Sequence, residues 1–287
     1  MAEIRDWVEH ESDWGRWTLV RAAPSPALRG DVVEYQGYVE RSGAPVVRRE
    51  APVPVVPVIL VFDAAFRMTD DATAGWRPLR RSFVAGLHER SVLVGSDGAA
   101  DCLQFDLTPI GARRLFRVDL GGLRNRVVDL QDLLGAEAER LADRLASARG
   151  WPARFLLLDG WLAERLGPAP PPAAEIASAW GLMRRTAGAA PVAALARRAG
   201  LSRQAFAQRF EREIGLRPKR AARLLRLERA LERLREPTPL AEVALACGYF
   251  DQAHFNRDMR EFCGRTPREL RADLLADGTG LMASRDA

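Results

Sequence analysis

The chain has 287 residues, of which 47% are hydrophobic and 28% are charged, with a formal net charge of +5. These proportions exclude a disordered or fibrous protein, and the length is sufficient for two domains. The most apolar stretch, residues 51–62, is too short to cross a bilayer and is interrupted by three prolines. The N-terminus lacks the pattern of a secretory signal, and three cysteines form no disulfide framework, so we expect a cytoplasmic protein that does not contact membranes.

The first part of the chain, up to about Pro109, has the pattern of β structure. Short runs rich in valine, leucine and aromatic residues alternate with Gly, Pro, Asp and Ser, and they predict strands at 17–20, 32–39, 46–49, 55–62, 91–94 and 102–107. Many short strands at this spacing predict a cupin-like antiparallel β sandwich or open barrel. Because Pro52, Pro54 and Pro57 cannot donate to a ladder, we expect their segment to enter its strand at a sheet edge.

The periodicity becomes helical from Gly111, beginning with a short helical turn at 112–116. Residues 130–148 predict one amphipathic helix, and Pro152 fits the first turn of a second. The apolar faces of the two helices are Leu133, Leu134, Ala138, Leu141 and Leu145, and Phe155, Leu158, Leu162 and Leu166. The pair either packs on the sheet or forms a dimer surface, and packing on its own domain is the simpler interpretation.

Positive charge is concentrated in the C-terminal third. Residues 185–275 contain 19 basic and 11 acidic residues, a net charge of +8, whereas the rest of the chain has 24 basic and 27 acidic residues, a net charge of −3. This asymmetry is typical of a nucleic-acid-binding module joined to a different domain. The segment PAPPP at 168–172 predicts a stiff, extended linker between the two.

The basic region contains one sequence unit that occurs twice. The copies are AALARRAGLSRQAFAQRFEREIG (193–215) and AEVALACGYFDQAHFNRDMREFCG (241–264), and each is followed by a Pro-containing turn. Each copy predicts a helix, a sharp turn at Gly200 or Gly248, and a second helix capped by Ser202 or Asp251. The second helices bury Phe206, Phe210 and Ile214, and Phe255, Met259 and Phe262. This is the pattern of a helix-turn-helix, whose second helix lies in the major groove of DNA.

The buried face of each second helix also determines its exposed face. The outward positions are Arg203, Gln204, Ala207, Gln208 and Arg212 in the first unit, and Gln252, Ala253, Asn256 and Arg257 in the second, with His254 and Arg260 at the flanks. Arg, Gln and Asn can form paired hydrogen bonds with guanine and adenine edges. Such faces are often merely solvated, but two of them with few acids in a domain of charge +8 favour DNA contact.

Residues 218–234 predict a helix between the two units, of about 16 residues and roughly 24 Å. Its inner face is Leu224, Leu227, Leu231 and Leu234, and its first turns carry Lys219, Arg220, Arg223 and Arg226. A rigid connector of this length could hold two second helices about one DNA turn apart, near 34 Å, within one chain.

Residues 176–274 resemble the DNA-binding domain of the AraC/XylS family of bacterial transcriptional regulators. The resemblance rests on LARRAGLSRQAFAQRFEREIGLRPKR, on LAEVALACGYFDQAHFNRDMREFCGRTPREL and on the helix between the two units, and Met259 departs from the usual phenylalanine. The resemblance implies base contacts from Arg203, Gln204, Ala207, Gln208, Gln252, Ala253, His254, Asn256 and Arg257, although His254 could equally cap or pack against the preceding helix. It implies DNA-backbone contacts from Arg212, Lys219, Arg220, Arg260 and Thr266.

The N-terminal part is similar to a subgroup of AraC-type regulators, on the segments FVAGLH (83–88) and FDLTPIGARRLFRVDLGGLRNRVVDLQDLLG (105–135). The two resemblances together imply a domain for effector binding or dimerisation (1–167), a Pro-rich linker (168–175), a DNA-binding domain (176–275) and a flexible tail (276–287).

We therefore expect a sequence-specific transcriptional regulator that reads two successive major grooves with helices 202–213 and 251–262. Its expected partner is promoter DNA; RNA polymerase, a small-molecule effector and a second copy of the chain are further candidates. We expect no cofactor and no metal, because His10 and His88 are the only histidines of the first half. The alternatives are an enzyme or repair domain fused to a DNA-binding module, and a scaffold that acts through protein contacts alone.

Overall fold

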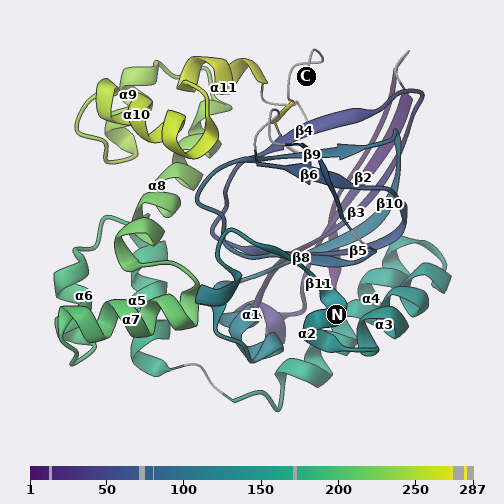
Figure 1. The fold of residues 1–287 in the computed structure, drawn as a ribbon, viewed down its shortest axis with the longest axis horizontal. Coiled ribbons are helices and arrows are strands. Elements are labelled where there is room, and N and C mark those ends of the chain that lie inside the picture. Colours follow the sequence, from purple (N-terminus) through teal and green to yellow (C-terminus); the bar gives the residue numbers. More distant parts are fainter. Residues whose placement is uncertain (13–14, 71–74, 80, 171–172, 274–280, 283–287) are drawn as a thin grey trace.

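The computed structural model describes residues 1–287 except 13–14, 71–74, 80, 171–172, 274–280 and 283–287. Its N-terminal domain consists of two antiparallel sheets that face each other (Figure 1). The larger sheet has the order β1 (Glu3–Ser12), β2 (Gly15–Ala23), β3 (Val32–Ser42), β10 (Ala99–Leu107), β5 (Val56–Ala64), β8 (Phe83–Ala85) and β11 (Val127–Asp129). The smaller has β12 (Leu281–Met282), β4 (Val46–Glu50), β9 (Val92–Ser96), β6 (Arg67–Thr69) and β7 (Arg77–Pro78). The expected cupin-like antiparallel fold is confirmed.

A cavity of about 760 Å³ lies between the two sheets, and the alternation of side chains along the strands forms it. In β10, Leu103 and Phe105 are fully buried on one face, while Gln104 and Asp106 line the cavity on the other. Successive residues of a strand point to opposite faces, so one strand supplies both a hydrophobic core and a polar cavity wall.

The prediction that the Pro52–Pro57 segment enters its strand at a sheet edge is wrong. β5 lies inside the larger sheet, between β10 and β8. Pro57 is tolerated there because it is the second residue of β5, and pairing with β8 involves only Val58 and Ile59. On the side of β8, Pro57 therefore has no partner residue that would need its N–H.

Four helices cover the face of the larger sheet that points away from the cavity (Figure 1): α1 (Pro109–Phe116), α2 (Leu130–Leu134), α3 (Glu137–Ser147) and α4 (Gly150–Leu166). Trp151 and Phe155 of α4 stack toward the sheet, and a Cβ on Gly37 of β3 would lie 2.3 Å from the Trp151 ring. The expected packing of these helices on their own domain is therefore present. The single helix expected over 130–148 is divided at Gly135, which adopts φ 61°.

The C-terminal domain is helical, with α5 (Ala174–Arg185), α6 (Val192–Arg198), α7 (Arg203–Ile214), α8 (Pro218–Leu234), α9 (Leu240–Ala246), α10 (Gln252–Cys263) and α11 (Pro267–Asp273). α8 is a 17-residue helix, with α5–α7 around one end and α9–α11 around the other (Figure 1). Residues 171–172 of the expected linker lie outside the described residues. So does most of the expected flexible tail, apart from β12, which pairs with β4.

Within the described part of the chain, no helix is both long and apolar enough to cross a membrane.

Candidate nucleic-acid interface

The first helix-turn-helix unit consists of α6 and α7. Gly200 forms the turn between them with φ 67°, a conformation that glycine adopts without strain. The Ser202 hydroxyl accepts a hydrogen bond from the Ala205 N–H at 3.2 Å and so caps α7. Phe206 and Phe210 are fully buried, and Trp180 of α5 packs 6.3 Å from Phe210 between ring centroids. The residues expected to form the turn, the cap and the buried face therefore do so.

The second unit, α9 and α10, repeats this construction. Gly248 turns the chain with φ 77°, and the Asp251 carboxylate accepts a hydrogen bond from the His254 N–H at 2.6 Å. Phe255 and Met259 are fully buried, so methionine at this position serves the core as phenylalanine would. The second turn is one residue longer than the first: Tyr249 and Phe250 separate its glycine from its cap, where the first unit has Leu201 alone. The helix that follows has the same length, 12 residues, as α7.

The side chains proposed to contact bases lie on the outer faces of α7 and α10. Arg203, Gln204, Gln208, Gln252, Ala253 and Arg257 are exposed, whereas Ala207, His254 and Asn256 are half-buried. Among the described residues, neither Arg203 nor Arg257 has a hydrogen bond or ion pair within the chain. Both guanidinium groups are therefore available to an external acceptor.

His254 packs within its own unit. Its ring meets the Tyr249 ring edge-on at 5.2 Å between centroids, its Nδ1 lies 3.5 Å from the Phe250 N–H, and its Nε2 lies 3.9 Å from Asp258. The sequence left open whether His254 contacts a base or packs against the preceding helix; its ring packs instead against the turn that follows α9 (Leu240–Ala246). Base contact by His254 would require the ring to leave these partners.

The five candidates for contact with the DNA backbone fall into two groups. Arg212, Lys219 and Arg260 are exposed. Thr266 instead caps α11: its hydroxyl accepts a hydrogen bond from the Glu269 N–H at 3.3 Å, and its own N–H and hydroxyl donate to the Glu269 carboxylate at 2.7 and 2.8 Å. Arg220 is engaged by the N-terminal domain and by α10.

An ion-pair network joins α8 to α10 and was not found from the sequence. Arg223 donates to Asp258, which is almost fully buried, at 2.8 Å, and also to Glu261. Hydrogen bonds from Arg223, and next from Arg220, hold the pKa of Glu261 at about 2, although partial burial opposes this shift. The network fixes the orientation of the second recognition helix on the connecting helix. Its only sequence signal was the pair of acids three residues apart on α10.

A second set of contacts ties the first unit to the N-terminal domain. Arg124 donates to Glu211 of α7 at 2.6 Å, and Arg113 of α1 pairs with Glu213 at 3.4 Å. The 3₁₀ turn η2 (Leu120–Leu123) packs along α7, and Leu120 lies against Gly215. The orientation of α7 is therefore coupled to the domain that contains the cavity.

A family model described as a helix-turn-helix domain matches residues 195–273. No curated protein matches the chain. Among solved structures, the chain is similar to ToxT from Vibrio cholerae, with 10% identity and a TM-score of 0.48 over 83% of this chain and 98% of that one. It is also similar to the C-terminal domain of AraT from Geobacillus stearothermophilus, with 18% identity and a TM-score of 0.33 over 40% and 92% of the two chains. The AraC-like transcriptional activator CuxR gives 16% identity and a TM-score of 0.33 over 81% and 86%.

The assignment rests on the family match together with the two capped, exposed helices described above. Residues 195–273 form an AraC-type helix-turn-helix domain, and the chain is a DNA-binding transcriptional regulator.

Proposed function

We propose that α7 and α10 enter successive major grooves on one face of a DNA duplex. Direct base readout would come from Arg203, Gln204, Ala207, Gln208, Gln252, Ala253, Asn256 and Arg257, and from His254 where its ring is released. The observation that carries this proposal is the pair of free, exposed recognition faces at the two ends of a single helix. α8 would span about 26 Å at 1.5 Å per residue, which suits two units placed one helical turn apart.

Phosphate contacts are proposed for Arg212, Lys219 and Arg260, whose side chains are exposed beside the recognition helices. Arg220 and Thr266 would contribute only after exchanging their present partners, Glu89 and Glu269. The accumulated positive charge of this domain predicts that affinity falls steeply with salt, because bound phosphates release counterions.

The N-terminal domain, residues 1–167, would modulate DNA binding as a small-molecule sensor. Its cavity of about 760 Å³ is within the range of ligand pockets. The ion pairs of Arg124 with Glu211 and of Arg113 with Glu213 offer a route from that domain to α7. A second copy of the chain and RNA polymerase are further proposed partners, and the interior of a bacterial cell is the proposed location.

A role for this domain in binding rather than catalysis suits its chemistry. Burial raises the pKa of the Cys102 thiol to about 12, so this thiol stays protonated at neutral pH and is unsuited to nucleophilic attack. The described residues contain no group of three or more His, Cys, Asp or Glu placed to hold a metal ion.

Fluorescence anisotropy tests the proposal, using the duplex that lies upstream of the gene for this protein and a scrambled duplex of the same composition. At moderate salt we expect tighter binding to the native duplex. A set of genomic fragments selected by the protein would extend the test to operators elsewhere. Failure to retain any duplex at low salt would contradict the proposal.

A further inference from the structure

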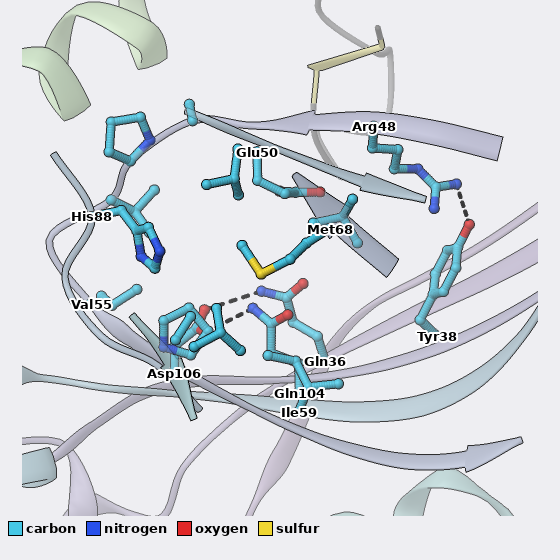
Figure 2. Close-up of a pocket in the computed structure, with 18 of the residues that line it drawn as sticks. Gln36, Tyr38, Arg48, Glu50, Val55, Ile59, Met68, His88, Gln104 and Asp106 are labelled. Atoms are coloured by element: carbon cyan, nitrogen blue, oxygen red, sulfur yellow. Dashed lines mark hydrogen bonds between the residues drawn. The ribbon is translucent and has the colours of Figure 1, made fainter. Parts of the chain in front are cut away.

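The cavity between the sheets is lined by apolar and polar side chains of both sheets. Met68, Phe66 and Val94 come from the smaller sheet and its flanks, while Ile59 and Phe83 come from the larger one. Figure 2 shows Glu50, His88 and Asp106 on different strands and loops around the same space. The cavity can therefore hold an apolar body with one polar end.

Two carboxyl groups in the cavity, one on each sheet, form no hydrogen bond or ion pair with a basic side chain among the described residues, although Arg48 lies near enough to Glu50 to oppose the rise that burial causes in its pKa. Asp106 accepts hydrogen bonds only from neutral amides, those of Gln104 at 2.8 Å and Gln36 at 3.3 Å. Glu50 has no hydrogen bond or ion pair among the described residues, and Figure 2 shows its side chain directed into the cavity. Burial chiefly raises the pKa of Asp106, to about 7, and the nearby Glu34 and Glu50 raise it further. Because neither carboxyl group has a cationic partner at hydrogen-bond distance, a cation bound beside them would stabilise their ionised forms.

Four arginines line the cavity: Arg90 and Arg235 are exposed, whereas Arg48 and Arg21 pair with acids other than Glu50 and Asp106. Arg48 pairs with Glu40 at 3.3 Å and hydrogen-bonds to the Tyr38 hydroxyl (Figure 2). Arg21 pairs with Asp6 at 3.2 Å and with Glu34 at 3.8 Å. Neither guanidinium is committed to Glu50 or Asp106 by a hydrogen bond or a close ion pair.

His88 adds a third acceptor. Its Nδ1 lies 2.7 Å from the Gly86 carbonyl oxygen, which can only accept, so Nδ1 donates. Burial lowers the pKa of His88, which keeps the ring neutral at physiological pH. The Nε2 atom of a neutral ring protonated at Nδ1 is an acceptor. Glu50, Asp106 and His88 thus all present acceptors to one cavity.

We infer that this cavity binds a small organic cation, a protonated amine or guanidine on an apolar body, with Glu50 and Asp106 as its counter-charges. This inference rests on the proposed sensor function of the N-terminal domain and specifies the chemical class of its effector. A cation would favour the ionised forms of Glu50 and Asp106 and would pair with them, whereas an anion would raise the pKa of both groups further.

Part of the rim of the cavity belongs to the DNA-binding domain. Glu228, Leu231 and Glu232 of α8 line the same cavity. Burial chiefly raises the pKa of Glu228, to about 7, and the neighbouring Glu232 adds to the shift. A cation that reaches this rim would contact the helix that joins the two recognition units. Ligand binding would thereby act on both recognition units through α8.

Matched fluorescent probes test the inference with the full chain. Each of three dansyl amines, made from ethylenediamine, cadaverine and octanediamine, is compared with its N-acetyl derivative and with the dansyl amino acid of similar length. We expect at least one amine to bind with a Kd about tenfold lower than that of both partners, a difference of ~1.4 kcal/mol. Equal binding within every set, tighter binding of the acids, or no binding of any amine would overturn the inference.

Three variants locate the charge that the amine recognises. Glu50→Gln and Asp106→Asn keep the side-chain shape and should each reduce the preference for the amine, and the double variant should abolish it. Asp63→Asn, at a position 77% exposed on β5, is the control and should retain the preference. An unchanged preference in the folded double variant would also overturn the inference. Because probe fluorescence requires no DNA, its outcome is independent of whether the protein reads an operator.

Discussion

The side chain of Arg220, in the first turn of α8, contacts both the side chain and the backbone of Glu89 in the N-terminal domain. Its Nε lies 3.0 Å from the Glu89 carboxylate, and its Nη2 donates to the Glu89 carbonyl oxygen at 2.7 Å. The same guanidinium lies 4.1 Å above the Phe262 ring of α10. One side chain therefore connects the cavity domain, the connecting helix and the second recognition helix.

Replacement of Arg220 by alanine should loosen the domain interface. It removes the ion pair with the Glu89 carboxylate and two charge-assisted hydrogen bonds, to the Glu89 carbonyl oxygen and to Glu261, from a largely buried site, with an expected loss of about 1–3 kcal/mol in the free energy of unfolding. Urea denaturation and limited proteolysis between the domains measure the effect. Arg217→Ala is the matched control, since Arg217 is 72% exposed and its ion pair with Glu211 should contribute at most about 1 kcal/mol. Equal losses in the two variants would contradict a special role for Arg220.

Replacement of Arg257 by alanine should relax specificity at one base pair. Arg257 is exposed on α10 and has no partner among the described residues, so its removal should cost DNA binding about 1–3 kcal/mol while folding is retained. Anisotropy against operators changed one base pair at a time measures the change. A loss of the same size on scrambled DNA would show that Arg257 contacts only phosphate. Arg203→Ala provides the equivalent test for α7.

Replacement of Asp258 by alanine should displace the second recognition unit. Asp258 is 3% exposed and accepts two hydrogen bonds from Arg223, at 2.8 and 3.5 Å, so its loss leaves a guanidinium without its buried partner. Because Arg223 is 30% exposed and keeps its hydrogen bonds to Glu261, we expect a destabilisation of about 1–3 kcal/mol, with weaker binding to the half-site read by α10. Thermal unfolding and half-site titrations give the two readouts. Glu242→Gln on α9 is an exposed control, and a folded Asp258→Ala protein that reads both half-sites normally would refute the role.

Asp106 and Glu228 should make the protein more stable at pH 6 than at pH 8, while His88, whose pKa is lowered by burial, opposes them toward the lower pH. Because burial raises the folded-state pKa of Asp106 to about 7, above its usual value near 3.8, its ionisation opposes folding as the pH rises through 7. This group alone should contribute about 1.4 kcal/mol over that interval, and Glu228, whose pKa is raised similarly, acts in the same direction. Urea denaturation at both pH values measures the difference. Asp106→Asn should reduce it, and a dependence identical to that of the wild type would contradict the assignment.

Local signals predicted the DNA-binding half well. The glycine turns, the Ser202 and Asp251 caps and the spacing of Phe206, Phe210 and Phe255 all depend on residues a few positions apart. Such interactions are determined by helix geometry, which the sequence encodes directly. The packing of His254 on Tyr249 was open at the sequence level, because a half-exposed histidine suits either a base or a ring.

The N-terminal half was predicted less completely. β1 was missed because it is an edge strand in which most residues are charged or polar, and its apolar Ile4 and Trp7 are 40% and 49% exposed. The position of β5 in the sheet was predicted wrongly because a proline shows only that an N–H donor is missing, and it does not show how many strands lie beside it. No signal in the sequence placed Glu50 near Asp106, since the two come from different sheets.

The sequence by itself determined the duplicated unit, the recognition faces and the class of protein, because each depends on contacts within one helix or between adjacent helices. Only the tertiary structure decided that Arg220 holds Glu89 instead of standing free, and that Glu50, His88 and Asp106 share a cavity whose rim is α8. The reason is physical: strand alternation and helix periodicity determine which face a side chain occupies, whereas the partner of that face depends on the packing of distant segments.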